Sequence, residues 1–201
     1  HRVVEKPSNP ATNLAVVGVY AFGPTIFDSI DANEPSDRGE YEITDAIQHL
    51  IDTGRQVQSS ILEGFWEDAG APEALLRANQ LYLARQTHSP GKQTDDIVID
   101  GKPVQIGAET SMDNVTVHAP CYVGDRCVLE DCEIGPHVSL LEGCQIRNST
   151  IRNTIVEKNS VILDLVSGMV NSILGEDVVL HGSGRGDSPL HLILGDMAQM
   201  R

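Results

Sequence analysis

Residues 117–146 read VHAPCYVGDRCVLEDCEIGPHVSLLEGCQI, and apolar residues recur in this stretch at about every sixth position. An α-helix has about 3.6 residues per turn and cannot hold such a period on one face. A short fixed period is instead typical of a solenoid, in which each unit buries its apolar face only against its neighbours. The repeating positions, here and further along the chain, are Val117, Val123, Leu129, Ile134, Leu140, Ile146, Ile155, Val161, Ile173 and Val179.

This spacing resembles the hexapeptide repeat of left-handed parallel β-helices, in which three short strands make one triangular coil. The resemblance predicts a left-handed parallel β-helix with a C-terminal tail in residues 97–201. In the tail, Leu190, Leu192 and Leu194 are expected to form a last strand that covers an open end of the solenoid. Because the flat sides of such β-helices commonly stack on one another, we also expect a homo-oligomer.

Residues 1–86 show the α/β pattern, in which short apolar strands alternate with helical segments. Residues 14–22 and 57–62 are predicted to be strands, and the first is almost continuously apolar, as in a parallel strand covered on both faces. Between them, apolar residues at helical spacing predict a helix over residues 43–51, with Gly54 as the residue just past its end.

A further helix is expected over residues 72–85, because proline is tolerated in a first helical turn and Glu73 lies near the positive end of the helix dipole. Residues 87–96 are polar and contain Pro90 and Gly91, which predicts a linker. The side chains expected on the packed side of the helix are Leu75, Ala78, Leu81 and Tyr82.

The chain has 201 residues, of which 40% are hydrophobic, and a formal net charge of −15. This acidic balance argues against nucleic-acid binding, which depends on basic patches that neutralise phosphates. No segment approaches the roughly 18 consecutive apolar residues that span a bilayer, and no secretory signal opens the chain. We therefore expect a cytoplasmic protein that does not bind membranes.

The four cysteines lie at positions 121, 127, 132 and 144, with His118 and His137 nearby. A zinc site and disulfide bonds are both possible interpretations of such a group. The cysteines form no C-x-x-C pair, however, and each stands where the repeat requires a small buried residue. We expect them to pack as small apolar side chains in a reducing compartment.

Short polar motifs lie at the ends of the apolar segments in the first part of the chain. Taken together, in this order and spacing, they resemble the second half of glucose-1-phosphate thymidylyltransferases, which are sugar-1-phosphate nucleotidyltransferases. The long type with a C-terminal left-handed β-helix is the most similar. The motifs do not decide between dTTP and UTP as the nucleotide. They are Glu5-Lys6-Pro7, Val16-x-Gly18-x-Tyr20, Arg38-Gly39-Glu40-x-Glu42-Ile43-Thr44-Asp45 and Trp66-x-Asp68-x-Gly70.

The resemblance implies that residues 1–86 form the C-terminal, sugar-binding part of a Rossmann-like nucleotidyltransferase domain. Enzymes of this kind transfer a nucleotidyl group from dTTP to glucose-1-phosphate and yield dTDP-glucose and pyrophosphate. The glycine-rich nucleotide-binding loop of the family is not found in these residues, which begin with His1. We therefore expect the C-terminal portion of an enzyme, and we expect this span to be inactive by itself.

The resemblance also assigns roles to individual residues. Lys6 and Arg38 are the candidate catalytic residues, because a compact ammonium and a guanidinium fork both suit phosphate. A surface ion pair with a nearby acid is the alternative for Arg38. Asp68 is the candidate ligand of Mg²⁺, which takes oxygens from carboxylates, phosphates and water. The candidate substrate-binding residues are Glu5, Lys6, Val16, Gly18, Tyr20 and Arg38.

Two other classes of function are compatible with a hexapeptide solenoid. Many such proteins are acyltransferases that use a histidine as general base, which makes His118, His137 and His181 candidates. The repeats contain no long inserted loop that would close an active site. The other class is a non-catalytic module for oligomerisation or regulation.

Overall fold

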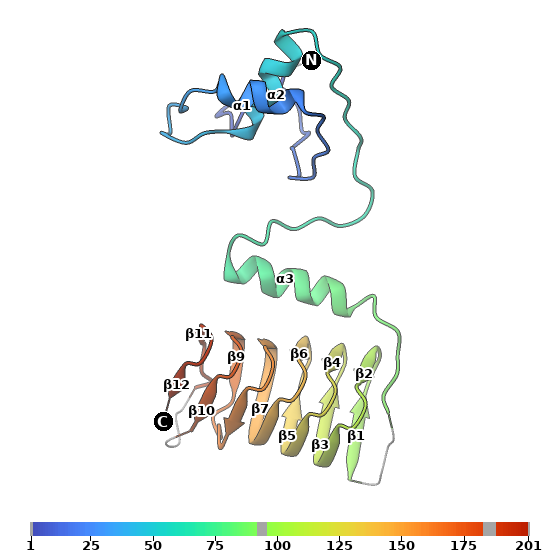
Figure 1. The fold of residues 1–201 in the computed structure, drawn as a ribbon. Helices are drawn as coiled ribbons and strands as arrows, with labels where there is room; N and C mark the ends of the chain where they lie inside the picture. Colours follow the sequence, from blue (N-terminus) through green and yellow to red (C-terminus); the bar gives the residue numbers. More distant parts are fainter. Residues whose placement is uncertain (1, 92–95, 183–187, 201) are drawn as a thin grey trace. The chain divides into compact units, whose positions relative to one another are not determined.

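The computed structural model describes residues 2–91, 96–182 and 188–200 (Figure 1). Contacts within the chain divide it into two compact units, His1–Trp66 and Glu67–Arg201. The first unit contains two helices joined by long irregular segments, and the second contains one helix and a parallel β-solenoid. Among the described residues, no helix has the length and apolar character needed to cross a membrane.

In the first unit, helix α1 (Thr25–Asp31) packs against helix α2 (Ile43–Asp52). Their contact is a small buried cluster made by Ile26, Ala46 and Leu50. The helix predicted over residues 43–51 is confirmed, and its hydrophobic spacing accounts for the buried side.

The predicted end of α2 is also confirmed. Gly54 adopts a φ of +74°, in the left-handed region that glycine enters at little cost. Its N–H donates to the carbonyl of Ile51 over 3.0 Å, and the N–H of Arg55 donates to the carbonyl of Leu50 over 2.9 Å. This pair of hydrogen bonds is the Schellman motif, which satisfies carbonyls that would otherwise lack a partner at the helix end.

The predicted strands at residues 14–22 and 57–62 are wrong, because neither segment pairs with a strand among the described residues. Their apolar side chains are instead open to solvent, with Leu14 69%, Val19 81% and Ile61 78% exposed. A parallel strand requires hydrogen bonds to a neighbouring strand and cover on both faces. Neither condition is met inside the first unit, so the two segments remain extended and unpaired.

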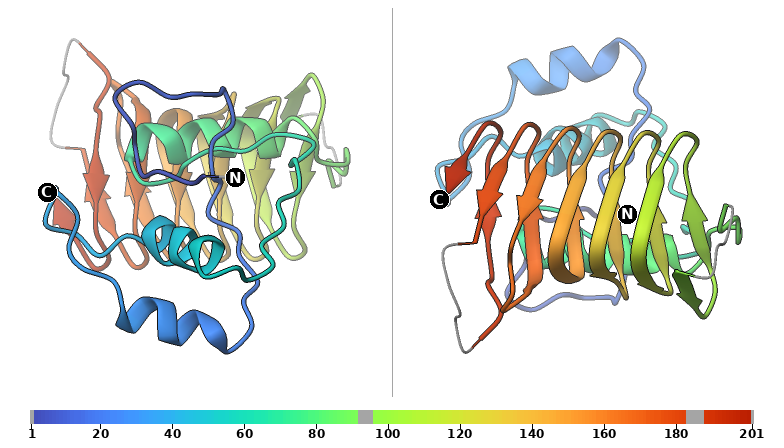
Figure 2. Two further views of the ribbon diagram at one scale, coloured as in Figure 1. Left: turned by 90° about the horizontal axis from the view of Figure 1, so that it is seen from above. Right: turned by 90° about the horizontal axis from the view of Figure 1, so that it is seen from below.

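In the second unit, three short strands make each coil of the solenoid, and equivalent strands of successive coils pair in parallel to form three flat faces (Figure 2). Ile97 pairs with Val115 and Val115 pairs with Cys132, so one coil takes 18 or 17 residues. The predicted triangular coil is thereby confirmed, whereas its left hand stays a prediction. The strands are β1 (Ile97–Asp100), β2 (Val104–Ile106), β3 (Ser111–His118), β4 (Cys121–Val123), β5 (Val128–Ile134), β6 (Val138–Leu140), β7 (Gln145–Val156), β8 (Val161–Leu163), β9 (Met169–Leu174), β10 (Val179–His181), β11 (Ile193–Leu194) and β12 (Gln199–Met200).

The interior of the solenoid is filled by columns of side chains that stack from coil to coil. One column starts at Met112 of β3, which pairs with Leu129 of β5, and Leu129 in turn pairs with Ile146 of β7 in the next coil. As predicted, the repeating residues of the second and third coils point inward. Val117, Val123, Leu129, Ile134, Leu140 and Ile146 are each at most 1% exposed.

In the later coils the predicted inward positions are wrong by one residue. Each predicted residue there is followed by a second apolar residue, and it is this second residue that is buried. Strand alternation sends only one of two neighbours inward, and pairing with the preceding coil decides which one, as when Val156 pairs with Leu140. The predicted residues Ile155, Val161, Ile173 and Val179 are partly exposed, and the inward residues are Val156, Ile162, Leu174 and Leu180.

Helix α3 (Pro72–Leu83) begins at the predicted proline and packs on the solenoid, where it contacts β7 and β9 (Figure 1). The amide of Asn79 connects the two: its Oδ1 accepts from the Ser139 hydroxyl over 2.6 Å, and its Nδ2 donates to the His137 carbonyl over 3.3 Å. The predicted packed side is wrong for Leu75, Leu81 and Tyr82, which are exposed, whereas Ala74, Leu76 and Leu83 are buried.

The contact between α3 and the solenoid explains why the units divide after Trp66 rather than near residue 86. The predicted boundaries therefore stay a prediction from the sequence. They are a domain in residues 1–86, a linker in residues 87–96 and a solenoid in residues 97–201. Within the predicted linker, Ser89 pairs with Gln105 of the first coil, and residues 92–95 lie outside the described residues.

The predicted last strand over Leu190, Leu192 and Leu194 is present only in part, because β11 contains Leu194 alone of the three. β11 pairs with β9, and Leu190 forms a bridge with Met169, so the leucines of the tail continue the solenoid. Residues 183–187 of the tail lie outside the described residues.

The four cysteines are free thiols and are all buried in the solenoid, which confirms their predicted role as packing residues. Burial raises the pKa of the Cys121 thiol to about 12 and that of the Cys132 thiol to about 11. Thiols with such high pKa values stay protonated at neutral pH and are poor metal ligands and nucleophiles.

Candidate functional site

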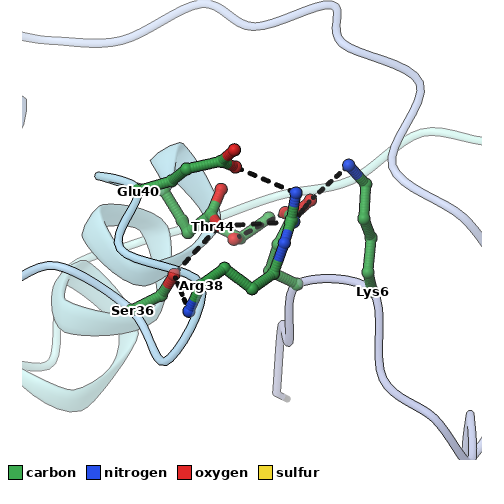
Figure 3. A network of polar contacts seen from close by, with 7 residues as sticks. Lys6, Ser36, Arg38, Glu40 and Thr44 are labelled. Atoms are coloured by element: carbon green, nitrogen blue, oxygen red, sulfur yellow. Dashed lines mark hydrogen bonds and ion pairs between the residues drawn. The ribbon is translucent and has the colours of Figure 1, made fainter.

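Arg38 lies at the centre of a cluster of charged side chains in the first unit (Figure 3). Its Nη2 lies 2.9 Å from Oε2 of Glu40, and its Nη1 lies 3.4 Å from Oε1 of Glu42 and 3.8 Å from Oε1 of Glu5. Both terminal nitrogens therefore face carboxylates. Arg38 is therefore in the ion-paired state named above as the alternative to phosphate binding. A phosphate would have to compete with these acids for the guanidinium.

Glu5 and Glu42 are held in place by hydroxyl groups. Oε2 of Glu5 accepts a hydrogen bond from Oγ1 of Thr44 over 2.9 Å, and Oε1 of Glu42 accepts one from Oγ of Ser36 over 3.1 Å. Thr44 lies in the first turn of α2, and Glu42 immediately precedes that helix. The start of α2 thus brings Glu5 and Arg38, which are far apart in sequence, to one place.

Lys6 is the most accessible cation of the cluster. Its side chain is 70% exposed, and its ion pair with Glu5 spans 4.0 Å. Such a long, exposed contact holds the ammonium weakly, because surface ion pairs contribute at most about 1 kcal/mol. Figure 3 shows the ammonium directed toward the same place as the guanidinium of Arg38. Lys6 therefore remains available to an anionic ligand.

Val16, Gly18 and Tyr20 lie on a different segment of the first unit. The indole Nε1 of Trp66 donates to the carbonyl of Val17 over 3.1 Å and fixes this segment. Tyr20 stacks on Phe22, with ring centroids 5.5 Å apart. Gly18 has a φ of +73° and open space where a β carbon would lie, so glycine is needed here for backbone conformation.

Asp68 belongs to the second unit and lies just before α3. Its Oδ1 accepts a hydrogen bond from the N–H of Gly70 over 3.2 Å. The neighbouring Glu67 is paired with Arg77 of α3, whose Nε donates to it over 2.8 Å and whose Nη2 donates over 2.5 Å. The Glu67 carboxylate is thus occupied by Arg77. The described residues contain no group of three or more metal-binding side chains.

The cluster contains four residues that were not predicted as site residues, namely Ser36, Glu40, Glu42 and Thr44. Glu42 and Thr44 stand within the quoted motif around Arg38, and their place at the predicted start of a helix was the available signal. Glu42 immediately precedes α2 and Thr44 lies in its first turn. The helix holds both residues in place, which suits them to orient a neighbouring charge.

On the solenoid, His118 is part of a row of charged side chains that crosses successive coils. Its Nδ1 lies 3.1 Å from Oδ2 of Asp100 and its Nε2 lies 3.0 Å from Oε1 of Glu133. Arg152 donates to the same oxygen of Glu133 over 2.7 Å. Both ring nitrogens of His118 thus have partners, an arrangement that leaves neither nitrogen free to take a proton from a substrate.

The two other candidate histidines are not held in this way. His137 is partly buried, and burial lowers its pKa below the ordinary value. His181 is exposed at the end of β10. The three histidines therefore differ in exposure and in the hydrogen bonds of their rings.

Replacing Arg152 with glutamine is expected to raise the pKa of Glu133. The hydrogen bond from Arg152 is the main cause that holds the pKa of this carboxyl below its usual 4.5, with the nearby His118 as a lesser cause. A depressed folded-state pKa contributes stability above pH 4.5, and that contribution is lost as the pH falls through the folded-state value. A titration of the side-chain carboxyl carbon by NMR measures the pKa.

Arg147 offers a matched control, because it makes a similar 2.7 Å ion pair with a different acid, Glu130. Arg147→Gln should leave the titration of Glu133 unchanged. An unchanged midpoint in Arg152→Gln would contradict the assignment of the shift to Arg152.

Comparison with known proteins shows that this chain is similar to sugar nucleotidyltransferases. Residues 1–85 match the family model described as nucleotidyl transferase. The glucose-1-phosphate thymidylyltransferase of Streptomyces antibioticus is 34% identical over 197 residues, which cover 98% of this chain and 55% of that protein. A low-salt glycan biosynthesis nucleotidyltransferase of Haloferax volcanii is 36% identical, over 100% of this chain and 57% of that protein.

A bifunctional sugar-1-phosphate nucleotidylyltransferase/acetyltransferase of Sulfurisphaera tokodaii is 29% identical over 88% of this chain and 45% of that protein. The chain spans about half the length of the curated relatives that it matches. Its similarity to them runs through both the charged cluster and the solenoid. Residues 1–85 thus match the nucleotidyl transferase family, and in this chain a parallel β-solenoid follows them.

Proposed function

We propose that this chain provides the sugar-phosphate side of a nucleotidyltransferase that makes dTDP-glucose and pyrophosphate from dTTP and glucose-1-phosphate. The observation that carries the proposal is the cluster of Glu5, Lys6 and Arg38 within the segment that matches the nucleotidyl transferase family. Glucose-1-phosphate thymidylyltransferases that align with 98% and 96% of the chain support the choice of sugar and nucleotide.

The reaction needs no nucleophile from the protein. An oxygen of the sugar phosphate attacks the α-phosphorus of the triphosphate, a new P–O bond forms, and pyrophosphate leaves with the electrons of the broken P–O bond. The protein has to hold two anions in line and neutralise the charge between them. A chain with a net charge of −15 needs local cations for this task.

Lys6 is the residue that we assign to the sugar phosphate, because its ammonium is accessible and weakly paired. Glu5 lies beside it and accepts hydrogen bonds, which suits it to sugar hydroxyls. Arg38 binds Glu5, Glu40 and Glu42 in the absence of substrate, and a phosphate that displaces one of these acids would gain a bidentate partner. We assign the remaining sugar contacts to Val16, Gly18 and Tyr20.

Asp68 is a suitable but incomplete ligand for Mg²⁺. One carboxylate fits the ion only when substrate phosphates and water supply most of the six oxygens that it prefers. When bound, Mg²⁺ would act as a Lewis acid that neutralises charge on the phosphates. Among the described residues, Asp68 belongs to no group of three or more metal-binding side chains, and the neighbouring Glu67 is paired with Arg77.

Calorimetric titration of the chain with glucose-1-phosphate, with and without dTTP and Mg²⁺, tests the proposal. Replacing Lys6 with alanine is expected to weaken binding of glucose-1-phosphate about tenfold, because a charge-assisted hydrogen bond to phosphate contributes about 1.5 kcal/mol or more. The loss should appear in the affinity for glucose-1-phosphate and not in the stability of the fold.

Lys158 is a matched control, because it is an exposed lysine in a turn of the solenoid. Lys158→Ala should bind glucose-1-phosphate like the unchanged chain. Equal affinity in Lys6→Ala and Lys158→Ala would remove Lys6 from the site.

A second candidate function follows from the bifunctional relative, whose name includes an acetyltransferase. The exposed His181 and the partly buried His137 are the histidines of the solenoid that remain open to this role. A non-catalytic role in homo-oligomerisation is the other prediction for the solenoid, and sedimentation of the chain checks it.

A further inference from the structure

A cavity of about 450 Å³ lies within the second unit, between α3 and the last coils of the solenoid. One wall is formed by residues 72–80 of α3, and the other by the corners of two successive coils at Asn153 and Asn171 together with the segment at His191. Figure 1 shows α3 running along this face, and the view from above in Figure 2 agrees. The cavity uses none of the residues assigned to the proposed reaction.

The polar groups of this cavity have unused hydrogen-bonding capacity. Nε2 of Gln80 donates to Oδ1 of Asn153 over 2.8 Å, and Nδ2 of Asn153 donates to Oδ1 of Asn171 over 2.7 Å. This chain of amides ends at Nδ2 of Asn171, which has no acceptor among the described residues. Oε1 of Gln80 and the ring of His191 likewise have no partner in the described ranges.

Arg77 adds a further donor to the same wall. Its Nε and Nη2 are occupied by Glu67, which leaves Nη1 directed to no described acceptor. Because Glu67 neutralises the guanidinium and Glu73 also lines the cavity, the wall carries no excess of positive charge. The cavity therefore lacks the electrostatic character of a phosphate site.

The cavity also offers apolar surface. Leu76, which is 6% exposed, and Leu192 line it beside the amide groups. A pocket with apolar surface and a few convergent polar groups is the usual form of a small-molecule site. Nδ2 of Asn171 and Nη1 of Arg77 are donors and Oε1 of Gln80 is an acceptor, so together these groups can match hydroxyls, which act as both. The C–H surface of a sugar ring would contact the leucines.

We propose that this cavity binds a neutral, hydroxyl-rich ligand, namely a hexose unit of a carbohydrate. The residues that would bind it are Gln80, Asn171 and His191, with Arg77 as a further donor. This site is separate from Lys6 and Glu5, so the chain would hold two sugar sites of different charge.

The test is an NMR titration of the full chain with glucose, which follows the side-chain amides of Gln80 and Asn171. Both amide signals are expected to shift with a common saturation curve. Asn171→Ala and His191→Ala are each expected to weaken glucose binding about tenfold, as lost hydrogen bonds in a pocket do. A free hexose and the hexose of a larger glycan are distinguished by repeating the titration with a glucose disaccharide.

Asn148 is the matched control, because it also has a positive φ at a corner and donates to an acid, Asp164, over 3.1 Å. Asn148→Ala should leave glucose binding unchanged, and so should Lys6→Ala. The proposal is overturned if the Gln80 and Asn171 amides do not shift, if Asn171→Ala binds glucose normally, or if Lys6→Ala abolishes glucose binding. A Lys6→Ala variant that loses neither glucose nor glucose-1-phosphate binding would refute the assignment of Lys6 to the reaction and support this separate site.

Discussion

Replacing Asp68 with asparagine in a protein that carries the complete nucleotidyl transferase domain is expected to lower turnover about a hundredfold, or about 2.7 kcal/mol of transition-state stabilisation. Asparagine keeps the shape of the side chain and an oxygen that can accept from Gly70, so the local backbone should be retained. It removes the negative charge that a divalent cation requires. The effect should therefore appear in the rate and in the response to Mg²⁺.

The measurement is the rate of pyrophosphate release as a function of Mg²⁺ concentration. Asp68→Asn should require more Mg²⁺ for half of its maximal rate, which a purely structural defect would not cause. Asp28 on α1 is an exposed aspartate outside the proposed site, so Asp28→Asn serves as the matched control. Normal turnover and normal Mg²⁺ dependence in Asp68→Asn would show that this carboxylate is not a metal ligand.

Replacing Leu129 with alanine is expected to lower the free energy of unfolding by about 2–5 kcal/mol. Leu129 is fully buried and pairs in register with Ile146 of the next coil. Truncation would leave a hole in the stacked interior, and the flat parallel strands on either side can close it only in part. Because each coil is supported by its neighbours, the loss should weaken the solenoid rather than one strand alone.

Urea denaturation followed by circular dichroism in the β-sheet region measures this change. Leu75 is the matched control, since it is 40% exposed on α3 in the same unit. Leu75→Ala should change the midpoint much less than Leu129→Ala. Similar midpoints for the two variants would mean that the interior columns are not the main support of the solenoid.

The motifs of the first unit show how far a candidate site can be predicted from residues alone. Lys6 and Arg38 were predicted from their chemistry and their motifs, and the structure brings both to Glu5. That Glu5 would join Glu40 and Glu42 beside Arg38 was not predictable, because Glu5 is distant in sequence and is held there by the hydroxyl of Thr44 at the start of α2. A hydrogen bond between residues 39 positions apart has no local signal.

The unpaired segments at residues 14–22 and 57–62 illustrate the same limit for strands. Their apolar character is a property of the sequence, whereas strand structure depends on a neighbour that supplies hydrogen bonds and cover. Within the first unit no such neighbour exists among the described residues. Exposed apolar segments of this kind are open to pairing with another strand.

Features that depend on local chemistry were predictable from the amino-acid sequence alone. The six-residue period required a solenoid, the helical spacing and Gly54 set the extent of α2, and Pro72 set the start of α3. Which residue of each apolar pair faces inward depends on pairing between coils, as with Val156 rather than Ile155. The packing of α3 on the solenoid likewise depends on tertiary contacts. Period and caps depend on backbone geometry within a few residues, but register and packing depend on hydrogen bonds and surfaces contributed by distant parts of the chain.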